Sequence, residues 1–170
     1  DGSEARGQRA VLVSAVPQYL VDFEFNRNRS FDGTLNAPMT ITPSVARDES
    51  TLDVPIFNLL NYSSIPAGAT HFRIINAIAV ISDYAYNTIS KVYEATDPAL
   101  DKLSAVAFSA YLPVNALTTV QSIVATLPGS PTMTASVSVL NAVGIEFYQE
   151  VNGSYYVFNQ GNAMKIKQIF

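Results

Sequence analysis

Several residue types on which active sites commonly depend are scarce in this sequence. It contains no cysteine and no tryptophan, and His71 is its single histidine. The absence of cysteine excludes disulfide bonds, thiolate metal sites and cysteine nucleophiles, but it assigns no cellular compartment. Histidine catalysis also needs a nucleophile and an orienting group. Because His71 precedes Phe72 at the start of an apolar stretch, we interpret it as a packed or edge-strand residue.

Charge is the second scarcity. Only 14% of the residues are charged, the net charge is -4, and no basic run occurs, so the sequence predicts no binding of nucleic acid. Residues 103–145, a quarter of the chain, contain no Asp, Glu, Lys, Arg or His. Prolines and hydroxyl side chains interrupt this neutral segment, whereas a membrane-spanning helix needs about 20 apolar residues in succession. We therefore expect no membrane span.

The neutral segment favours an association role. Soluble domains usually cover their exposed surface with mixed charge. We expect residues 103–145 to supply core strands and an outer face of serine, threonine and alanine that contacts another copy of the chain or another protein. The candidate interface residues are Ser122, Thr126, Ser136 and Ser138.

Catalytic and metal-binding patterns are missing from the inventory. Glu146 and Glu150 lie four residues apart, which on one strand separates their backbones by roughly 13–14 Å, too far for a glycosidase pair. Asp97 and Asp101 supply too few oxygens for Ca²⁺. No phosphate-binding loop, nucleophile elbow or zinc-binding helix motif occurs. The sequence therefore predicts a protein that is not an enzyme and has no cofactor or metal.

The pattern of elements predicts an all-β fold. Residues 39–42 and 51–54 resemble a hairpin, and residues 70–81 a long strand with a buried middle. Helical turns are expected only over 17–23 and 97–103. The fold prediction is an immunoglobulin-like antiparallel β-sandwich with at most one or two short helical turns, and further strands over 91–95, 106–111, 122–127, 134–150, 154–158 and 163–169.

The strongest local signal is the pair Asn152 and Gly153 between two alternating aromatic and aliphatic runs. This pair is typical of a type I′ hairpin turn. The turn places Val151 opposite Ser154, Gln149 opposite Tyr156 and Tyr148 opposite Val157.

Two domain-level regions are expected. Residues 1–30 form an N-terminal arm or short helical lead-in, and residues 31–170 form a single β-sandwich domain. The basic spacing over 26–29 is balanced by nearby acids, and we interpret it as a solvated loop rather than an anion site.

Tyrosines keep a second function open. Exposed tyrosines on a β-sandwich stack on sugar faces, and Tyr84, Tyr86, Tyr148 and Tyr155 are the candidate ligand-facing residues. The alternative to self-association is thus a module that binds glycans or a cell-surface partner. The absence of tryptophan weakens this alternative.

Several short motifs in the sequence resemble those of a family of uncharacterised proteins from Bacteroidota. They are Arg6-Gly7-Gln8-Arg9, Phe23-Glu24-Phe25-Asn26, the stretch 66–74, the stretch 144–153 and Gly161-Asn162-Ala163. Members of that family carry a further basic, partly helical N-terminal segment. The resemblance implies that this chain is the C-terminal β portion of a longer precursor, trimmed near Asp1 and complete at Phe170, and it transfers no site.

These observations lead to one expectation about function. We expect a non-enzymatic structural or interaction protein, a self-associating subunit of an oligomer, filament or surface assembly. A location at the cell surface or outside the cell is favoured.

Overall fold

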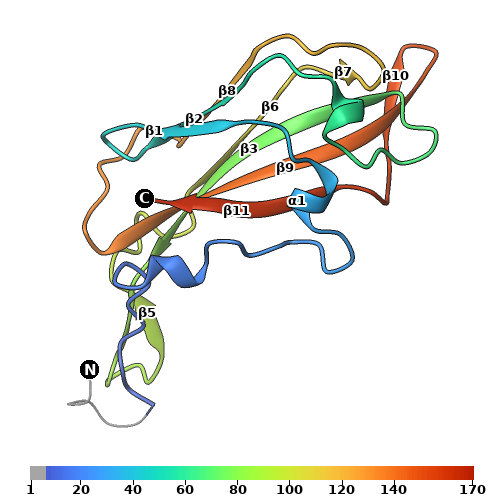
Figure 1. Ribbon diagram of the computed structural model, residues 1–170. Helices are drawn as coiled ribbons and strands as arrows, with labels where there is room; N and C mark the ends of the chain where they lie inside the picture. The colour runs from blue at the N-terminus through green and yellow to red at the C-terminus, as the bar shows by residue number, and fades with distance from the viewer. Residues whose placement is uncertain (1–6) are drawn as a thin grey trace.

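The computed structural model describes residues 7–170 and shows an all-β sandwich of two packed antiparallel layers (Figure 1). The all-β prediction is therefore confirmed. Residues 1–6 of the expected arm lie outside the described residues. The strands are β1 (Thr40–Pro43), β2 (Glu49–Val54), β3 (His71–Ser82), β4 (Tyr84–Tyr86), β5 (Tyr93–Ala95), β6 (Ser104–Phe108), β7 (Leu112–Pro113), β8 (Gln121–Thr126), β9 (Val137–Val151), β10 (Ser154–Val157) and β11 (Ala163–Ile169).

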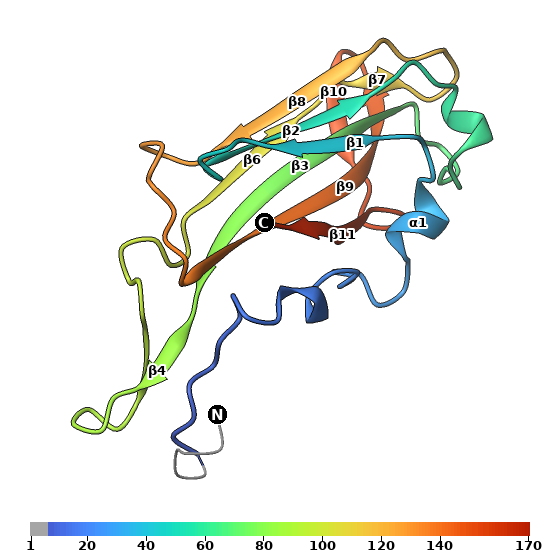
Figure 2. The same ribbon diagram turned by 60° about the vertical axis from the view of Figure 1, so that its left-hand side comes forward.

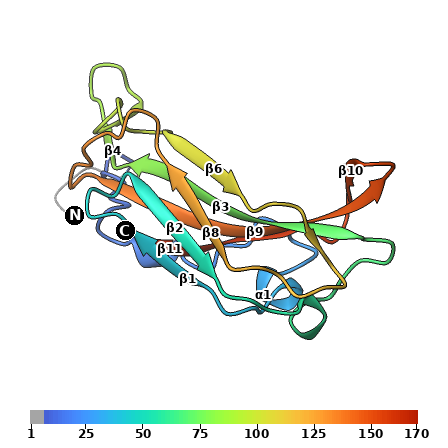
Figure 3. The same ribbon diagram turned by 90° about the horizontal axis from the view of Figure 1, so that it is seen from above.

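The larger layer is built on the long strands β3 and β9, which pair with each other along the full length of β3. β6 and β7 pair with the other side of β3, and β10 and β11 with the other side of β9. The smaller layer has the order β1-β2-β8. Seen from above, its strands lie over those of the larger layer at an angle to them (Figure 3).

Side-chain alternation explains how the layers pack. On β3 and β9, every second side chain points inward, and this inner set includes Phe72, Ile74, Val143, Ile145 and Phe147, all with no exposed surface. Burial of such side chains contributes about 1.5–3 kcal/mol each relative to leaving them in water. The inner faces of the two layers thus form the core of the protein.

A polar network also joins the layers at the centre of the core. The Ser50 hydroxyl donates to Asn141 Oδ1 at 2.7 Å, and Asn141 Nδ2 donates to Asn76 Oδ1 at 2.7 Å. Asn76 Nδ2 donates in turn to the carbonyls of Ser50 and Ile123, each at 2.8 Å. Each of these three side chains is fully buried, so hydrogen bonding offsets the cost of removing them from water.

The predicted hairpin is confirmed in both turn and register. Asn152 and Gly153 have φ angles of 53° and 80°, as a type I′ turn requires. Val151 pairs with Ser154, Gln149 with Tyr156 and Tyr148 with Val157.

Three short helices accompany the strands within residues 7–170. The 3-10 turn η1 (Pro17–Tyr19) lies in the expected helical stretch, while α1 (Phe31–Thr34) and the 3-10 turn η2 (Leu59–Asn61) are not anticipated by the sequence pattern. Side-chain caps explain both: Ser30 Oγ accepts from Gly33 N–H, and Asn58 Oδ1 accepts from Leu60 N–H. Residues 97–103 form turns rather than a helix.

One end of the molecule projects beyond the sandwich. β3 continues into the two-stranded hairpin β4–β5, and the N-terminal segment runs beside it (Figure 2). The segment is held there by backbone bonds between Val11 and Tyr84 and by Ser14, whose hydroxyl donates to Asp83 at 2.5 Å.

Candidate interaction surface

One edge of the sandwich is covered over much of its length, and we call it the covered edge: β11 in the larger layer and β1 in the smaller. Beyond β11 on the same side of β9, β10 has no strand on its second side within residues 7–170. The backbone of residues 22–25 lies along β11, since Phe25 N–H donates to the Met164 carbonyl at 3.0 Å and Ile166 N–H to the Phe23 carbonyl at 3.0 Å. β11 is also interrupted by a register shift between Ile166 and Gln168. β1 ends at Pro43, which has no N–H to offer. Covers, bulges and prolines are devices that prevent further strand pairing.

Charge reinforces the covered edge. Lys165 points inward from β11, is 11% exposed, and contacts Asp32 at 2.5 Å and Asp22 at 2.9 Å. Lys167 contacts the other oxygen of Asp32 at 2.6 Å. The hydrogen bonds from Lys165 and Lys167 lower the pKa of Asp32, and those to Asp32 and Asp22 raise the pKa of Lys165. These ion pairs attach the N-terminal arm and α1 to the last strand.

The opposite edge, formed by β6 and β8, is the open edge. No strand within residues 7–170 pairs with the second side of either one. Their sequences, Ser-Ala-Val-Ala-Phe and Gln-Ser-Ile-Val-Ala-Thr, contain neither charge nor proline. Both strands pair in unbroken register with their single neighbours. The open edge therefore lacks the protection that the covered edge has.

The outer face of the larger layer continues the open edge as an apolar trough. It is lined by Val106 on β6, which is 55% exposed, and by Phe25 from the arm, which is 57% exposed. The hollow has a volume of about 170 Å³. No charged side chain lines it, and its remaining lining includes Ala77, Ala79, Leu140 and Ala142. An exposed apolar surface of this kind is typical of a contact with another molecule.

The structure separates the four residues predicted for a neutral interface. Ser122 and Thr126 are exposed on β8, with the Thr126 hydroxyl donating to Glu49 at 2.8 Å. Ser136 is half-buried and donates to Asp97 at 2.9 Å. Ser138 is buried, which corrects its placement as an exposed interface residue: β9 is an interior strand, and Ser138 pairs with Ile81 of β3.

The four candidate tyrosines do not form one patch. Tyr84 and Tyr86 lie on the projecting hairpin, at the far end of β3 from the hairpin β9–β10 that carries the other two (Figures 1 and 2). The Tyr84 hydroxyl donates to Asp101 at 2.6 Å, and this hydrogen bond raises its pKa. Tyr86 packs edge-on against Tyr93.

Tyr148 and Tyr155 belong to an aromatic cluster with Tyr111. Tyr155 stacks on Tyr111 with ring centres 3.8 Å apart, so one of its faces is already covered. Tyr148 is buried, which corrects its placement as ligand-facing, because Tyr111 packs edge-on against it. Burial and a hydrogen bond to Glu146 raise the pKa of Tyr148 to about 12. Arg73 lies over Tyr111, 4.8 Å from the ring centre.

Neither the open edge nor the trough is identified by sequence alone. The sequence shows that β6 and β8 are uncharged, as parts of residues 103–145. It does not show that these strands are the last in their layers, because this depends on the order of the strands. Among residues 7–170 no group of three or more acidic or histidine side chains is placed to hold a metal ion. Within the same residues, every helix is too short to cross a membrane.

Comparison with protein-family models, with curated proteins and with solved structures finds no match for this chain. The resemblance to a Bacteroidota family stays a prediction.

Proposed function

We propose that this protein is a non-enzymatic structural or interaction protein whose copies associate through the open edge. One observation carries the proposal: β6 and β8 end their layers as regular, uncharged strands without a further partner among the described residues. Addition of a strand from another chain satisfies the free backbone groups and needs no charged recognition code.

The ladder between β3 and β6 defines which backbone groups are free. Ser109 N–H donates to the Ile74 carbonyl at 2.9 Å, so the N–H and C=O of Val106 and of every second residue from it point away from β3. A second β6 placed antiparallel, with Val106 opposite Val106, forms about six new backbone hydrogen bonds. This arrangement is a two-fold contact in which each copy uses the same surface.

The side chains suit such a contact. Two neutral β6 strands bring no like charges together, although each copy has a net charge of -4. Val106 and Phe108 are 55% and 42% exposed and point to the outer face, so pairing places the two apolar troughs side by side. β8 lies over β6 at the same edge, which brings Ser122 and Thr126 close to the contact.

The finer assignments are part of the same proposal. The sandwich is immunoglobulin-like, and the assembly is an oligomer, filament or layer at the cell surface or outside the cell. The two packed antiparallel layers support the first assignment. Assemblies on cell surfaces that grow by strand addition support the second by analogy.

Light scattering over a concentration series tests the proposal. We expect the average mass of the wild-type protein to rise with concentration and the Val106→Lys protein to stay monomeric, because a lysine on an edge strand opposes strand addition. Val45→Lys is the matched control, since Val45 is fully exposed in the turn between β1 and β2 and gains the same charge. A wild-type protein that is monomeric at every concentration, or an equal loss of association in both variants, would contradict self-association through this edge.

A further inference from the structure

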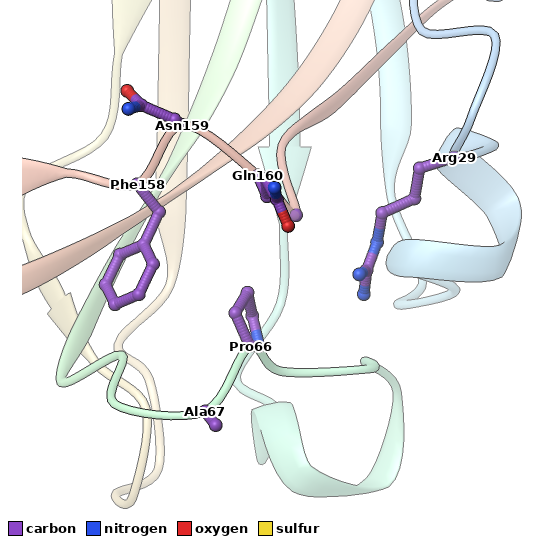
Figure 4. A pocket seen from close by; sticks show the side chains of 7 residues that line it. Arg29, Pro66, Ala67, Phe158, Asn159 and Gln160 are labelled. Atoms are coloured by element: carbon purple, nitrogen blue, oxygen red, sulfur yellow. The ribbon is translucent and has the colours of Figure 1, made fainter.

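A large hollow lies away from the open edge, between three segments distant in sequence. Figure 4 shows Arg29 from the arm, Pro66 and Ala67 from the loop before β3, and Asn159 and Gln160 from the loop between β10 and β11 around it. Its volume is about 520 Å³, and it adjoins a second hollow of about 420 Å³ that shares Arg29 and both amide side chains. These volumes are typical of sites for small molecules, about 300–1,000 Å³.

The walls of this pocket are held in place by hydrogen bonds. Asn162 Nδ2 donates to the Phe158 carbonyl at 2.7 Å, and its Oδ1 accepts from Phe147 N–H at 2.9 Å. Asn26 Nδ2 donates to the Asn162 carbonyl at 2.8 Å, which joins the arm to this loop. Arg29 Nε donates to Thr34 Oγ1 at 3.0 Å, and its Nη2 donates to the Ser64 carbonyl.

A glycine brings two of the walls together. Gly161 has a φ of 94°, and a Cβ on it would lie 2.4 Å from Pro66 Cγ. Any larger residue would therefore force the loop 158–161 away from the loop 66–67. The close approach of these two loops is therefore part of the fold and needs no ligand, which lowers the entropic cost of binding.

Several polar groups around the pocket have no hydrogen-bond partner within residues 7–170. The side-chain amides of Asn28, Asn159 and Gln160 make no hydrogen bond to any residue from 7 to 170. Each amide offers both donors and an acceptor, as hydroxyl groups require of their partners. Arg29 is the one charged side chain in the lining of either hollow, and its Nη1 is not engaged within the described chain. The half-buried ring of Phe158 and the ring of Pro66 add apolar surface.

We propose that this pocket binds a saccharide unit that carries a carboxylate, such as a hexuronic acid in a polysaccharide. The free amides would form hydrogen bonds with the hydroxyls of the sugar, and Arg29 would pair with its carboxylate. The rings of Phe158 and Pro66 would pack against its C–H face. The site contains none of the four tyrosines considered for glycan binding. It is also independent of the open edge, although association through that edge would multiply the number of pockets that meet one polymer.

Titration of the ¹⁵N-labelled protein with trigalacturonate, followed by NMR, tests the inference. We expect saturable shifts of backbone amides in loops 66–67 and 158–161. The methyl ester of the same trisaccharide, which keeps the shape but not the charge, is expected to bind about tenfold more weakly. Citrate tests whether carboxylates alone suffice, and we expect no saturable shift with it.

Variants assign the binding to this pocket. Ala67→Trp fills the mouth from an exposed position, and Gln160→Ala removes an exposed amide that the fold does not use. We expect at least a tenfold loss of affinity for the first and about a threefold to tenfold loss for the second. Arg27→Ala is the control, because Arg27 is exposed, two positions before Arg29 and outside the lining.

Three results would each overturn the assignment. They are the absence of saturable shifts up to roughly 10 mM trisaccharide, equal binding of the ester or of citrate, and unchanged affinity in the Ala67→Trp protein. Because the Val106→Lys variant leaves this pocket intact, the same titration on that monomer separates a failure of saccharide binding from a failure of self-association.

Discussion

The two edges of the sandwich differ in charge, in regularity and in cover. The covered edge has Lys165 and Lys167 on β11, a register shift, a terminal proline on β1 and a segment of the arm lying along it. The open edge has two regular neutral strands and none of these devices. Proteins commonly protect the edges of their sheets with such devices. Our proposal is that the edge without these devices is the one that contacts another copy of the chain.

The largest loss of stability is expected in the core between the two edges, and the effects at the edges are compared with it. Phe147 is fully buried on β9, which supports both layers. We expect Phe147→Ala to lower the free energy of unfolding by about 3–5 kcal/mol, the cost of a large cavity. Chemical denaturation of the monomer measures this value. A loss below about 1 kcal/mol would mean that the inner face is not packed as described.

The second largest loss of stability is expected at the covered edge. Changing both Asp22 and Asp32 to Asn leaves Lys165 largely buried without a carboxylate, and we expect a loss of about 2–3 kcal/mol, less than for a fully buried pair because both acids are partly exposed. Hydrogen exchange of the Phe25 and Ile166 amides should speed up in this variant. Asp53→Asn, an exposed change on β2, is the control and should cost less than about 0.5 kcal/mol.

A pH series separates the two edges without mutation. The pKa of Asp32 is lowered in the folded protein from its ordinary 3.8, so its contribution is present above that pH and is lost as the pH falls through the folded value. The pKa of Lys165 is raised from 10.5, so its contribution is present below that pH and is lost only at higher pH. We expect acid to loosen the arm on β11 first. β6 contains no titratable group, and its own ladder to β3 should respond only later.

The smallest effect on stability is expected at the open edge. Val106 is half-exposed, so Val106→Lys should change the free energy of unfolding of the monomer by less than about 0.5 kcal/mol. If this change removes association while the Asp22 and Asp32 changes leave association intact, association depends on the open edge and not on the covered edge. If Val106→Lys unfolds the protein, the open edge is part of the fold and not a contact surface.

Local patterns in the sequence were sufficient for much of the fold. The register of the Asn152-Gly153 hairpin follows from turn geometry, and the alternation over 70–81 gives β3 to within one residue at each end. The burial of Ser138 and Tyr148 was not predictable in this way. Tyr148 is covered by Tyr111, which lies 37 positions earlier, and such contacts depend on how separate strands are ordered.

The pocket illustrates the same limit. The sequence predicts a solvated loop over residues 26–29, because the basic residues there are nearly balanced by acids nearby along the chain. In the folded protein these acids do not pair with Arg29. Asp32 forms ion pairs with Lys165 and Lys167, and Glu24 accepts a hydrogen bond from the Phe31 N–H. Composition along a segment predicts its average charge, whereas a site depends on which charges are already paired.

The attachment of residues 22–25 to β11 has a consequence for how the chain folds during synthesis. The arm is synthesised before β1, whereas its pairing strand β11 and the central strand β9 follow β1 to β8 in the chain. Until those residues emerge, β3 lacks its longest partner and presents apolar side chains on both faces. Such long-range pairing slows folding and exposes the nascent chain to aggregation. We therefore expect the nascent chain to stay prone to aggregation until β9 and β11 have been made.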